Sequence, residues 1–252
     1  MEPANGADGT ISNLAMPRLS PAFKRLEERL AEVSHLHLVA RKYAQMKKII
    51  KHKDQVAHTN ALVRSATVLL SSHIQGYVED LSDIVIEHLI ADDVDAVLVP
   101  EALRYHATKS AIKEIRDASD PAATIQKLRS YLDDYGEILR KDGLVSPSLA
   151  GSEYKNGFGN PTVGEIKKFL SIFGLNDFNA QMGKRLKGDW PIVENAVNQI
   201  VDRRNKIAHG DVLATLTVRE LSEYLKLARK FASNVDRVVT SHFSSKGCKF
   251  WA

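Results

Sequence analysis

The sequence is almost without cysteine and has no long apolar segment. Its only cysteine, Cys248, excludes an intramolecular disulfide and any zinc or iron–sulfur site built from several cysteines. No run of about 18 apolar residues occurs, so no membrane-spanning helix is expected. The first 17 residues lack the basic start and apolar block of a signal peptide. We therefore expect a cytoplasmic protein that does not associate with membranes.

The sequence also has little that favours β-strands. Stretches that alternate apolar and polar residues are few, and β-branched runs are short. Hydrophobic residues make up 44% of the 252 residues and charged residues 26%, which is the balance of a folded globular protein. Apolar residues instead recur at spacings of three and four, after helix-start signals such as Ser20-Pro21 and Asp120-Pro121. The sequence predicts an all-α fold, a single helical-bundle domain.

We place this domain at residues 20–243. Residues 1–19 are rich in Gly, Asn, Ala and Pro without periodicity, and we expect a disordered tail there. Residues 244–252 form a short basic and aromatic tail. Residues 142–161 are rich in glycine and proline and predict a long loop inside the domain, because neither flank holds a self-sufficient hydrophobic pattern. Helices are predicted over approximately residues 20–43, 56–90, 101–118, 121–140, 162–173, 191–209 and 217–242.

Positive and negative charges gather in different parts of the chain. The net charge is only +4, but residues 18–53 carry ten Lys and Arg against three Asp and Glu. Residues 54–140 carry eight against fifteen, and residues 184–252 carry thirteen against seven. The two basic segments could pair with the acidic middle in the fold, or they could leave a basic surface for phosphates. Charge alone leaves both possibilities open.

The predicted helix that ends near His209 holds the residues most suited to chemistry. Its apolar face consists of Val193, Val197, Ile200 and Ala208. Arg204 lies on that same face, and because a guanidinium is rarely buried unpaired it needs a carboxylate partner, a cavity or a subunit interface. Arg203 is expected to point to solvent. His209 precedes Gly210, a helix-end signal, so by spacing alone His209 could be only a capping residue and Arg204 only part of a buried ion pair.

The amino-acid sequence of this segment resembles the signature of the HEPN superfamily. Residues 200–210, IVDRRNKIAHG, contain an arginine, a polar residue directly after it, and a histidine five residues on. Residues 23–38 and 73–81 resemble the first two helices of the RiboL-PSP branch, so the resemblance covers about residues 20–240. It implies a domain that dimerises so that two motifs meet in one cleft. It also implies a metal-independent endoribonuclease, often a toxin or a phage-defence effector.

The resemblance assigns a role to four residues. His209 is the acid/base group, Arg204 the phosphate ligand, and Asn205 a supporting polar residue. Glu79 is a further candidate, because many members place an acidic residue on an early helix near the motif; a solvated carboxylate is the alternative. The implied partners are RNA, a second copy of the chain, and an antitoxin or another component of a defence system.

These residue types suit RNA cleavage on chemical grounds as well. RNA carries its own nucleophile, the 2′-OH, which a histidine can deprotonate near neutral pH, while an arginine binds the phosphate oxygens. DNA lacks this hydroxyl. The sequence has no dense carboxylate cluster of the kind that a metal nuclease needs, so neither a metal nor another cofactor is expected. Two other interpretations stay open: a HEPN-type module that binds RNA or protein without cutting, and a helical adaptor with no role in nucleic-acid binding.

Overall fold

The computed structural model describes residues 18–46, 52–91, 94–140, 143, 145, 149 and 152–248. These residues form eight α-helices and three short 3-10 helices, which confirms the all-α prediction. The α-helices are α1 (Pro21–Gln45), α2 (His52–Ala91), α3 (Glu101–Arg116), α4 (Pro121–Arg140), α5 (Val163–Ser171), α6 (Phe178–Leu186), α7 (Trp190–Ala208) and α8 (Val218–Ser244). The 3-10 helices are η1 (Ala96–Leu98), η3 (Ser152–Lys155) and η4 (Lys187–Asp189).

Parts of the predicted tails and loop lie outside the described residues. Residues 1–17 hold nearly all of the predicted N-terminal tail, and residues 249–252 hold the end of the C-terminal one. Most of the first half of the predicted loop over residues 142–161 lies outside as well.

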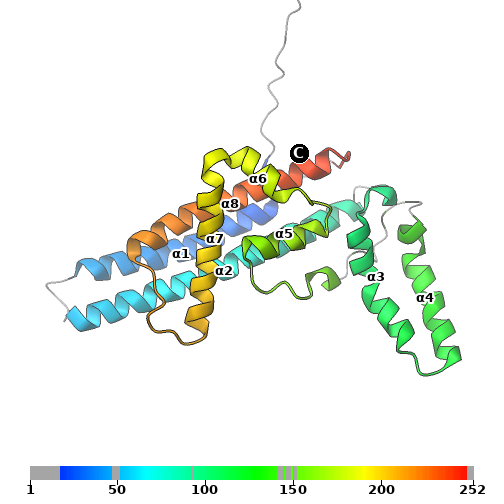
Figure 1. The fold of residues 1–252 in the computed structure, drawn as a ribbon, viewed down its shortest axis with the longest axis horizontal. Helices are drawn as coiled ribbons and strands as arrows, with labels where there is room; N and C mark the ends of the chain where they lie inside the picture. Colours follow the sequence, from blue (N-terminus) through cyan, green and yellow to red (C-terminus); the bar gives the residue numbers. More distant parts are fainter. Residues whose placement is uncertain are drawn as a thin grey trace, which may run out of the picture.

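The long helices build one elongated bundle. In Figure 1, α1, α2 and α8 run along the long axis of the molecule, while α7 crosses them. The helices α5 and α6 pack beside α7, and α6 also packs on α8. The pair α3 and α4 forms a hairpin that extends from one end of the bundle.

Two of the predicted helix starts are capped as the sequence indicates. The Ser20 hydroxyl accepts a hydrogen bond from the Phe23 N–H at 3.1 Å, and Pro21 takes the first helical position of α1. Thr217 and Glu220 form a reciprocal capping box at the start of α8. Because each cap satisfies N–H groups that the helix leaves without partners, these starts fix where α1 and α8 begin.

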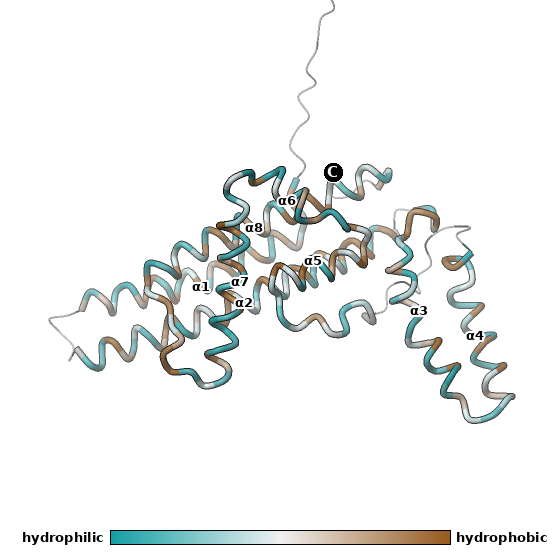
Figure 2. The backbone as a smooth tube through the Cα atoms, in the orientation of Figure 1, coloured by the Kyte–Doolittle hydropathy of each residue, from teal (hydrophilic) through white to brown (hydrophobic). Residues whose placement is uncertain are grey.

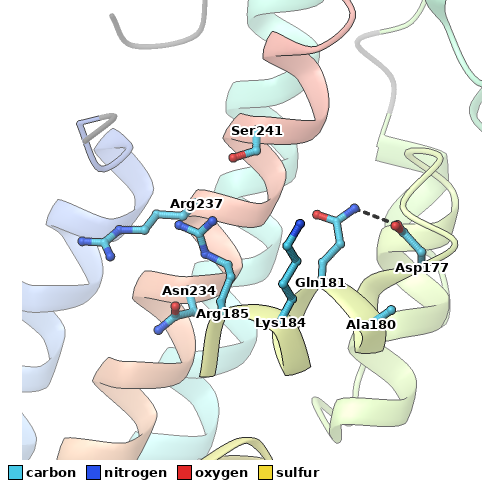
Figure 3. A pocket seen from close by; sticks show the side chains of 8 residues that line it. All are labelled: Asp177, Ala180, Gln181, Lys184, Arg185, Asn234, Arg237 and Ser241. Atoms are coloured by element: carbon cyan, nitrogen blue, oxygen red, sulfur yellow. Dashed lines mark hydrogen bonds between the residues drawn. The ribbon is translucent and has the colours of Figure 1, made fainter. Parts of the chain in front are cut away.

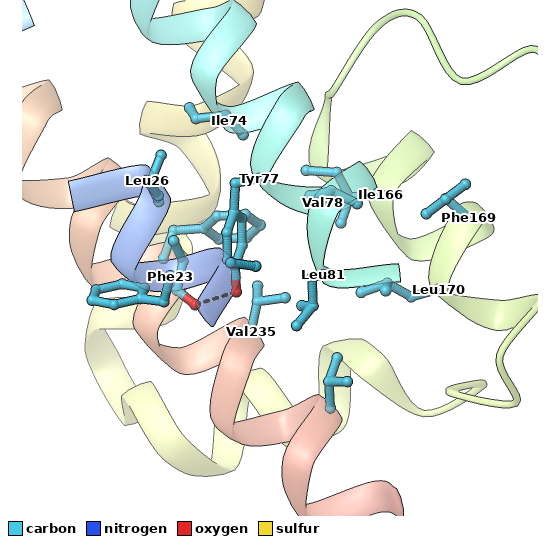
Figure 4. Packing of buried hydrophobic residues seen from close by; sticks show 14 of the residues in the cluster. Phe23, Leu26, Ile74, Tyr77, Val78, Leu81, Ile166, Phe169, Leu170 and Val235 are labelled. Atoms are coloured by element: carbon cyan, nitrogen blue, oxygen red, sulfur yellow. Dashed lines mark hydrogen bonds between the residues drawn. The ribbon is translucent and has the colours of Figure 1, made fainter. Parts of the chain in front are cut away.

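The core lies where α1, α2, α5 and α8 meet. Figure 4 shows Tyr77 of α2 among the apolar side chains of this region, and its hydroxyl donates to the Ala232 carbonyl of α8 at 2.9 Å. The surrounding buried side chains include Leu26, Ile74, Val78, Leu81, Ile166, Leu170 and Val235. Each buried aliphatic side chain contributes about 1.5–3 kcal/mol, so this cluster holds the four helices in one unit.

Among the described α-helices, α6 is the one that the sequence patterns did not predict. It has nine residues, and Asp177 before it makes no capping hydrogen bond through its side chain. Its stability comes from tertiary packing, because Phe178, Met182 and Leu186 are all buried. A short helix held in this way leaves no strong start signal in the sequence.

Candidate functional site

The helix α7 ends where the motif predicted. His209 is the C-cap residue, and Gly210 follows with φ of +85°, a left-handed conformation that favours glycine. The His209 backbone N–H donates to the Asn205 carbonyl at 3.0 Å. Its imidazole is exposed, and no described residue contacts it through a hydrogen bond or an ion pair. The histidine is therefore free to meet a ligand.

Arg204 is half-buried, and its guanidinium faces backbone and amide oxygens. Nη1 donates to Oδ1 of Asn205 at 3.0 Å, and Nη2 donates to the Gly159 carbonyl at 3.3 Å. Within the described part of the chain, no carboxylate forms an ion pair with it. The sequence left a carboxylate partner open for Arg204, and the structure instead places the side chain against an irregular segment.

That segment, residues 156–162, is held along α7 by amide side chains. The Asn205 Nδ2 donates to Oδ1 of Asn160 at 3.3 Å. About two turns earlier on α7, Oδ1 of Asn198 accepts the Val163 N–H at 2.9 Å, at the point where the segment enters α5. The loop therefore forms one wall beside Arg204, which the sequence did not predict, because these contacts join residues more than thirty positions apart.

The same segment also contacts the polar face of α2 that carries Glu79. The Gln75 Nε2 donates to Oε1 of Glu79 at 2.9 Å and to the Phe158 carbonyl at 3.4 Å. The Phe158 ring stacks on Phe169 of α5, with centroids 4.5 Å apart. Glu79 is thus linked through Gln75 to the segment that contacts Arg204. Among the described hydrogen bonds and ion pairs, Glu79 has none with Arg204, Asn205 or His209.

A second anchor, in η3 directly before this segment, joins the chain to α2 one turn further along. Asp83 accepts hydrogen bonds from the Tyr154 hydroxyl and the Lys155 ammonium, each at 2.5 Å. Burial, together with this carboxylate, raises the pKa of Tyr154 well above its usual range. The hydroxyl therefore stays protonated and remains a donor to Asp83 at any ordinary pH.

The apolar face of α7 ends sooner than predicted. Ala208 is exposed, and Arg203, which was expected to point to solvent, is partly buried with its Nε shielded from solvent and without a hydrogen-bond partner. Arg203 lies near Glu220 of α8. Hydrogen bonds with Thr217 are the main cause that lowers the pKa of Glu220, and the charge of Arg203 lowers it further. Ala208 is exposed because α7 crosses the bundle and its last turn extends beyond the helices that cover its middle.

The chain beyond the motif presents apolar side chains to solvent. Val212 is 78% exposed and Leu213 is 84% exposed. The loop that carries them is fixed, because Nη1 of Arg64 donates to the Asp211 carbonyl at 2.6 Å and to the Ala214 carbonyl at 3.1 Å. Next to this apolar tip lies a shallow groove of about 500 Å³ whose lining includes Ala61, Val68, Leu69 and Ile207.

The described residues offer neither a metal-binding cluster nor a membrane-spanning helix. No group of three or more His, Cys, Asp or Glu side chains in the described residues is placed to hold a metal ion. None of the described helices combines the length and hydropathy that crossing a bilayer requires.

Comparison with known proteins identifies the family. The family model described as RiboL-PSP-HEPN matches residues 24–241, a range that includes the motif on α7 and the early helices α1 and α2. Comparisons with curated proteins and with solved structures found no match. The matched range covers most of the chain and all of the described α-helices except the ends of α1 and α8. The chain therefore belongs to the RiboL-PSP-HEPN family.

Proposed function

We propose that the protein is a metal-independent endoribonuclease that cleaves RNA through Arg204 and His209. The observation that carries the proposal is the state of Arg204. Its guanidinium is held in a fixed place by Gly159 and Asn205, yet no carboxylate among the described residues neutralises it. A positioned cation without a counter-ion, on the same helix end as an exposed imidazole, suits a phosphate that bears negative charge.

In this mechanism Arg204 binds the scissile phosphate. A guanidinium has five N–H donors, and its hydrogen bonds to Asn205 and Gly159 occupy two of them. The remaining donors are available to the non-bridging oxygens, where negative charge grows as the 2′-OH attacks phosphorus. Asn205 is a positioning residue, because its amide oxygen fixes the guanidinium. Glu79 also acts through others, by holding Gln75 against the loop that carries Gly159.

His209 moves the protons. One imidazole takes the proton from the 2′-OH, and an imidazolium gives a proton to the departing 5′-oxygen. A single side chain cannot be in both protonation states at once, so we propose that a second copy of the chain supplies the other histidine. The exposed Val212 and Leu213 beside His209, and the adjacent groove, offer the apolar surface that such a homodimer would bury.

An enzyme that cuts RNA without a cofactor endangers the cell that makes it. We therefore extend the proposal to a toxin or phage-defence role in the cytoplasm, with an antitoxin or another defence component that restrains the nuclease. The support for this step is the family resemblance.

A HEPN-type module that binds RNA or protein without cutting it is the second candidate. The observation that favours it is that, among the described residues, no hydrogen bond joins the side chains of Arg204 and His209. Binding of RNA by the wild-type protein with no cleavage at any concentration would identify this second function.

In the decisive experiment, the purified protein is incubated with assorted RNAs in the presence of EDTA. We expect cleavage that leaves a 2′,3′-cyclic phosphate and a 5′-OH, because the 2′-OH is the nucleophile. His209→Ala should slow cleavage by roughly 100-fold or more, the usual contribution of a general acid or base. The control is His35→Ala, which removes an exposed histidine on α1 and should leave the rate unchanged.

Two results would contradict the mechanism. One is cleavage that stops when the metal is chelated, since a two-metal nuclease behaves in that way. The other is equal cleavage of a substrate in which the nucleotide 5′ to the cut carries a 2′-deoxy sugar, because that substrate lacks the nucleophile.

A further inference from the structure

A cavity of about 310 Å³ lies between α3, α5 and the segment that contacts Arg204. On α3 it is lined by Ala102 and His106, which are four positions apart and therefore share one face of the helix. Its lining residues on α5 also share one face, because they follow spacings of three and four: Glu165, Lys168, Phe169 and Ile172. The segment closes the third side with residues 156–158. Three elements thus converge on one space.

The wall that the segment contributes is aromatic. Phe158 is half-buried, and its ring stacks on Phe169 with centroids 4.5 Å apart. Figure 4 shows Phe169 on the side of α5 that points away from Tyr77 and the core. The Phe158 carbonyl accepts a hydrogen bond from Gln75 Nε2 at 3.4 Å, so the ring is held in place from α2 as well. The cavity therefore has a fixed, flat apolar surface.

The lining as a whole carries no net charge near neutral pH. Partial burial, and secondly the charge of Lys109, lower the pKa of His106, so its imidazole is neutral at pH 7. The Lys168 ammonium pairs with the Glu165 carboxylate at 2.6 Å. An uncharged aromatic group suits this lining better than a phosphate does.

The larger cavity between α6 and α8, of about 750 Å³, has a different character (Figure 3). Its lining is mostly polar and charged and includes no aromatic ring. Figure 3 shows the Arg237 side chain extending away from the other lining residues, so these groups do not converge on a ligand. The smaller cavity, with its stacked rings, is the one that suits a flat ligand.

The smaller cavity also adjoins the proposed phosphate site along the chain. Phe158 directly precedes Gly159, whose carbonyl accepts a hydrogen bond from Arg204 Nη2 at 3.3 Å. Consecutive Cα atoms are about 3.8 Å apart. A strand whose phosphate binds Arg204 therefore has a neighbouring base within reach of Phe158.

We propose that this cavity, the base pocket, binds an unpaired nucleobase next to the scissile phosphate. The base stacks on Phe158, and the neutral imidazole of His106 donates or accepts a hydrogen bond at the edge of the base. The inference rests on the proposed nuclease function and adds the substrate class, single-stranded RNA, because a base within a duplex is not free to stack on a protein ring. The volume lies at the lower end of the roughly 300–1,000 Å³ of small-molecule sites, as one base requires.

The test measures binding of short single-stranded oligodeoxynucleotides to the full chain by fluorescence anisotropy, since DNA lacks the 2′-OH and is not cleaved in the proposed mechanism. A strand with bases is compared with an abasic strand of the same length and charge. We expect the wild type to bind the strand with bases about 5- to 100-fold more tightly, the range for a stacked base.

Ala102→Trp fills the base pocket without removing a contact of Phe158, and it should bind both strands equally. The matched control is Ala122→Trp, because Ala122 is exposed and is the second residue of α4, as Ala102 is of α3. It should keep the preference of the wild type. Phe158→Leu keeps an apolar contact with Phe169 but removes the ring, and it should repeat the loss of preference if Ala102→Trp fails to fold.

The inference is overturned if the wild type binds the two strands alike, or if Ala102→Trp and Phe158→Leu keep the full preference. Cleavage of RNA in EDTA is measured separately, so that the two proposals can fail independently. If RNA is cleaved but the preference is absent, the nuclease stands and the base pocket is wrong. If Ala102→Trp abolishes the preference but the wild type cleaves no RNA, the base pocket stands as a site for single strands and the nuclease is wrong.

Discussion

The carboxylate of Asp236 ties the start of α1 to the middle of α8. It is fully buried and accepts hydrogen bonds from the Ser20 backbone N–H at 2.9 Å and from the Ser20 hydroxyl. The Tyr77 hydroxyl lies 3.5 Å from the same carboxylate. Because Ser20 is also the cap of α1, the loss of this acceptor leaves buried donors unpaired. Asp236→Ala should therefore lower the free energy of unfolding by about 1–3 kcal/mol.

The cost of Asp236→Ala should also depend on pH. Burial raises the pKa of Asp236, although the hydrogen bonds from Ser20 and Tyr77 oppose this. Between the ordinary pKa of 3.8 and the raised pKa of the folded state, Asp236 is protonated in the folded chain and ionised in the unfolded chain. The free energy of unfolding that this group contributes therefore falls as pH rises through that range. Urea unfolding should show a larger cost at pH 4 than at pH 7. Asp133→Ala, on the exposed face of α4, is the control, and equal costs at both pH values for Asp236→Ala would contradict the argument.

At the scale of elements, α2 positions the irregular segment that reaches the motif. Asp83 holds Tyr154 and Lys155, so Asp83→Ala should release residues 156–160 from α2. Under the proposed function, RNA cleavage should fall roughly tenfold or more, because a loop that shifts by about an ångström no longer holds the Arg204 guanidinium in place. Hydrogen exchange of the peptide over residues 156–160 should become faster.

The control for this prediction lies on the same helix. Asp80 pairs with Arg25 and Arg29 of α1, and so Asp80→Ala removes a paired carboxylate on a different face of α2. It should leave both the exchange of residues 156–160 and the cleavage rate close to wild type. A similar loosening of the loop in both variants would mean that Asp83 has no specific role as an anchor.

The sequence predicts elements better than it predicts the contacts between them. The caps at Ser20 and Thr217 and the end of α7 at His209 follow from local rules, because a cap involves residues three or four apart. The contact of Arg204 with Gly159 spans 45 positions through a loop without periodicity, and no pattern in the sequence encodes it. The sequence offered Glu79 as a candidate acid on an early helix, but it did not indicate that this helix receives the loop.

The α3–α4 hairpin shows a related limit of periodicity. The sequence predicts a helix over residues 121–140, and α4 is that helix, yet four of its large apolar side chains are exposed: Ile125, Leu128, Leu132 and Leu139. Figure 2 shows these hydrophobic stretches on the hairpin, outside the bundle. The 3.6-residue period identifies the helix correctly, but it does not say which neighbour covers the face.

At the scale of the whole molecule, the site requires a second copy in the proposed mechanism. The apolar tip at Val212 and Leu213 is held outward by Arg64 and by the Asp211 carboxylate, which accepts the Leu213 N–H at 2.9 Å. Leu213→Lys should convert the proposed dimer to a monomer in light scattering, because it places a charge in the proposed interface. Since Leu213 is 84% exposed in the single chain, the melting temperature of the monomer should stay nearly unchanged.

Ile192→Lys provides the matched control, because Ile192 is 57% exposed at the opposite end of α7. It should leave both the mass and the cleavage rate as in the wild type. The loss of dimers in Leu213→Lys should be accompanied by loss of cleavage, and the specific activity of the wild type should rise with protein concentration until the dimer is fully formed. A wild-type protein that is monomeric at every concentration and still cleaves RNA would show that one chain contains the complete site, and that the second histidine is not needed.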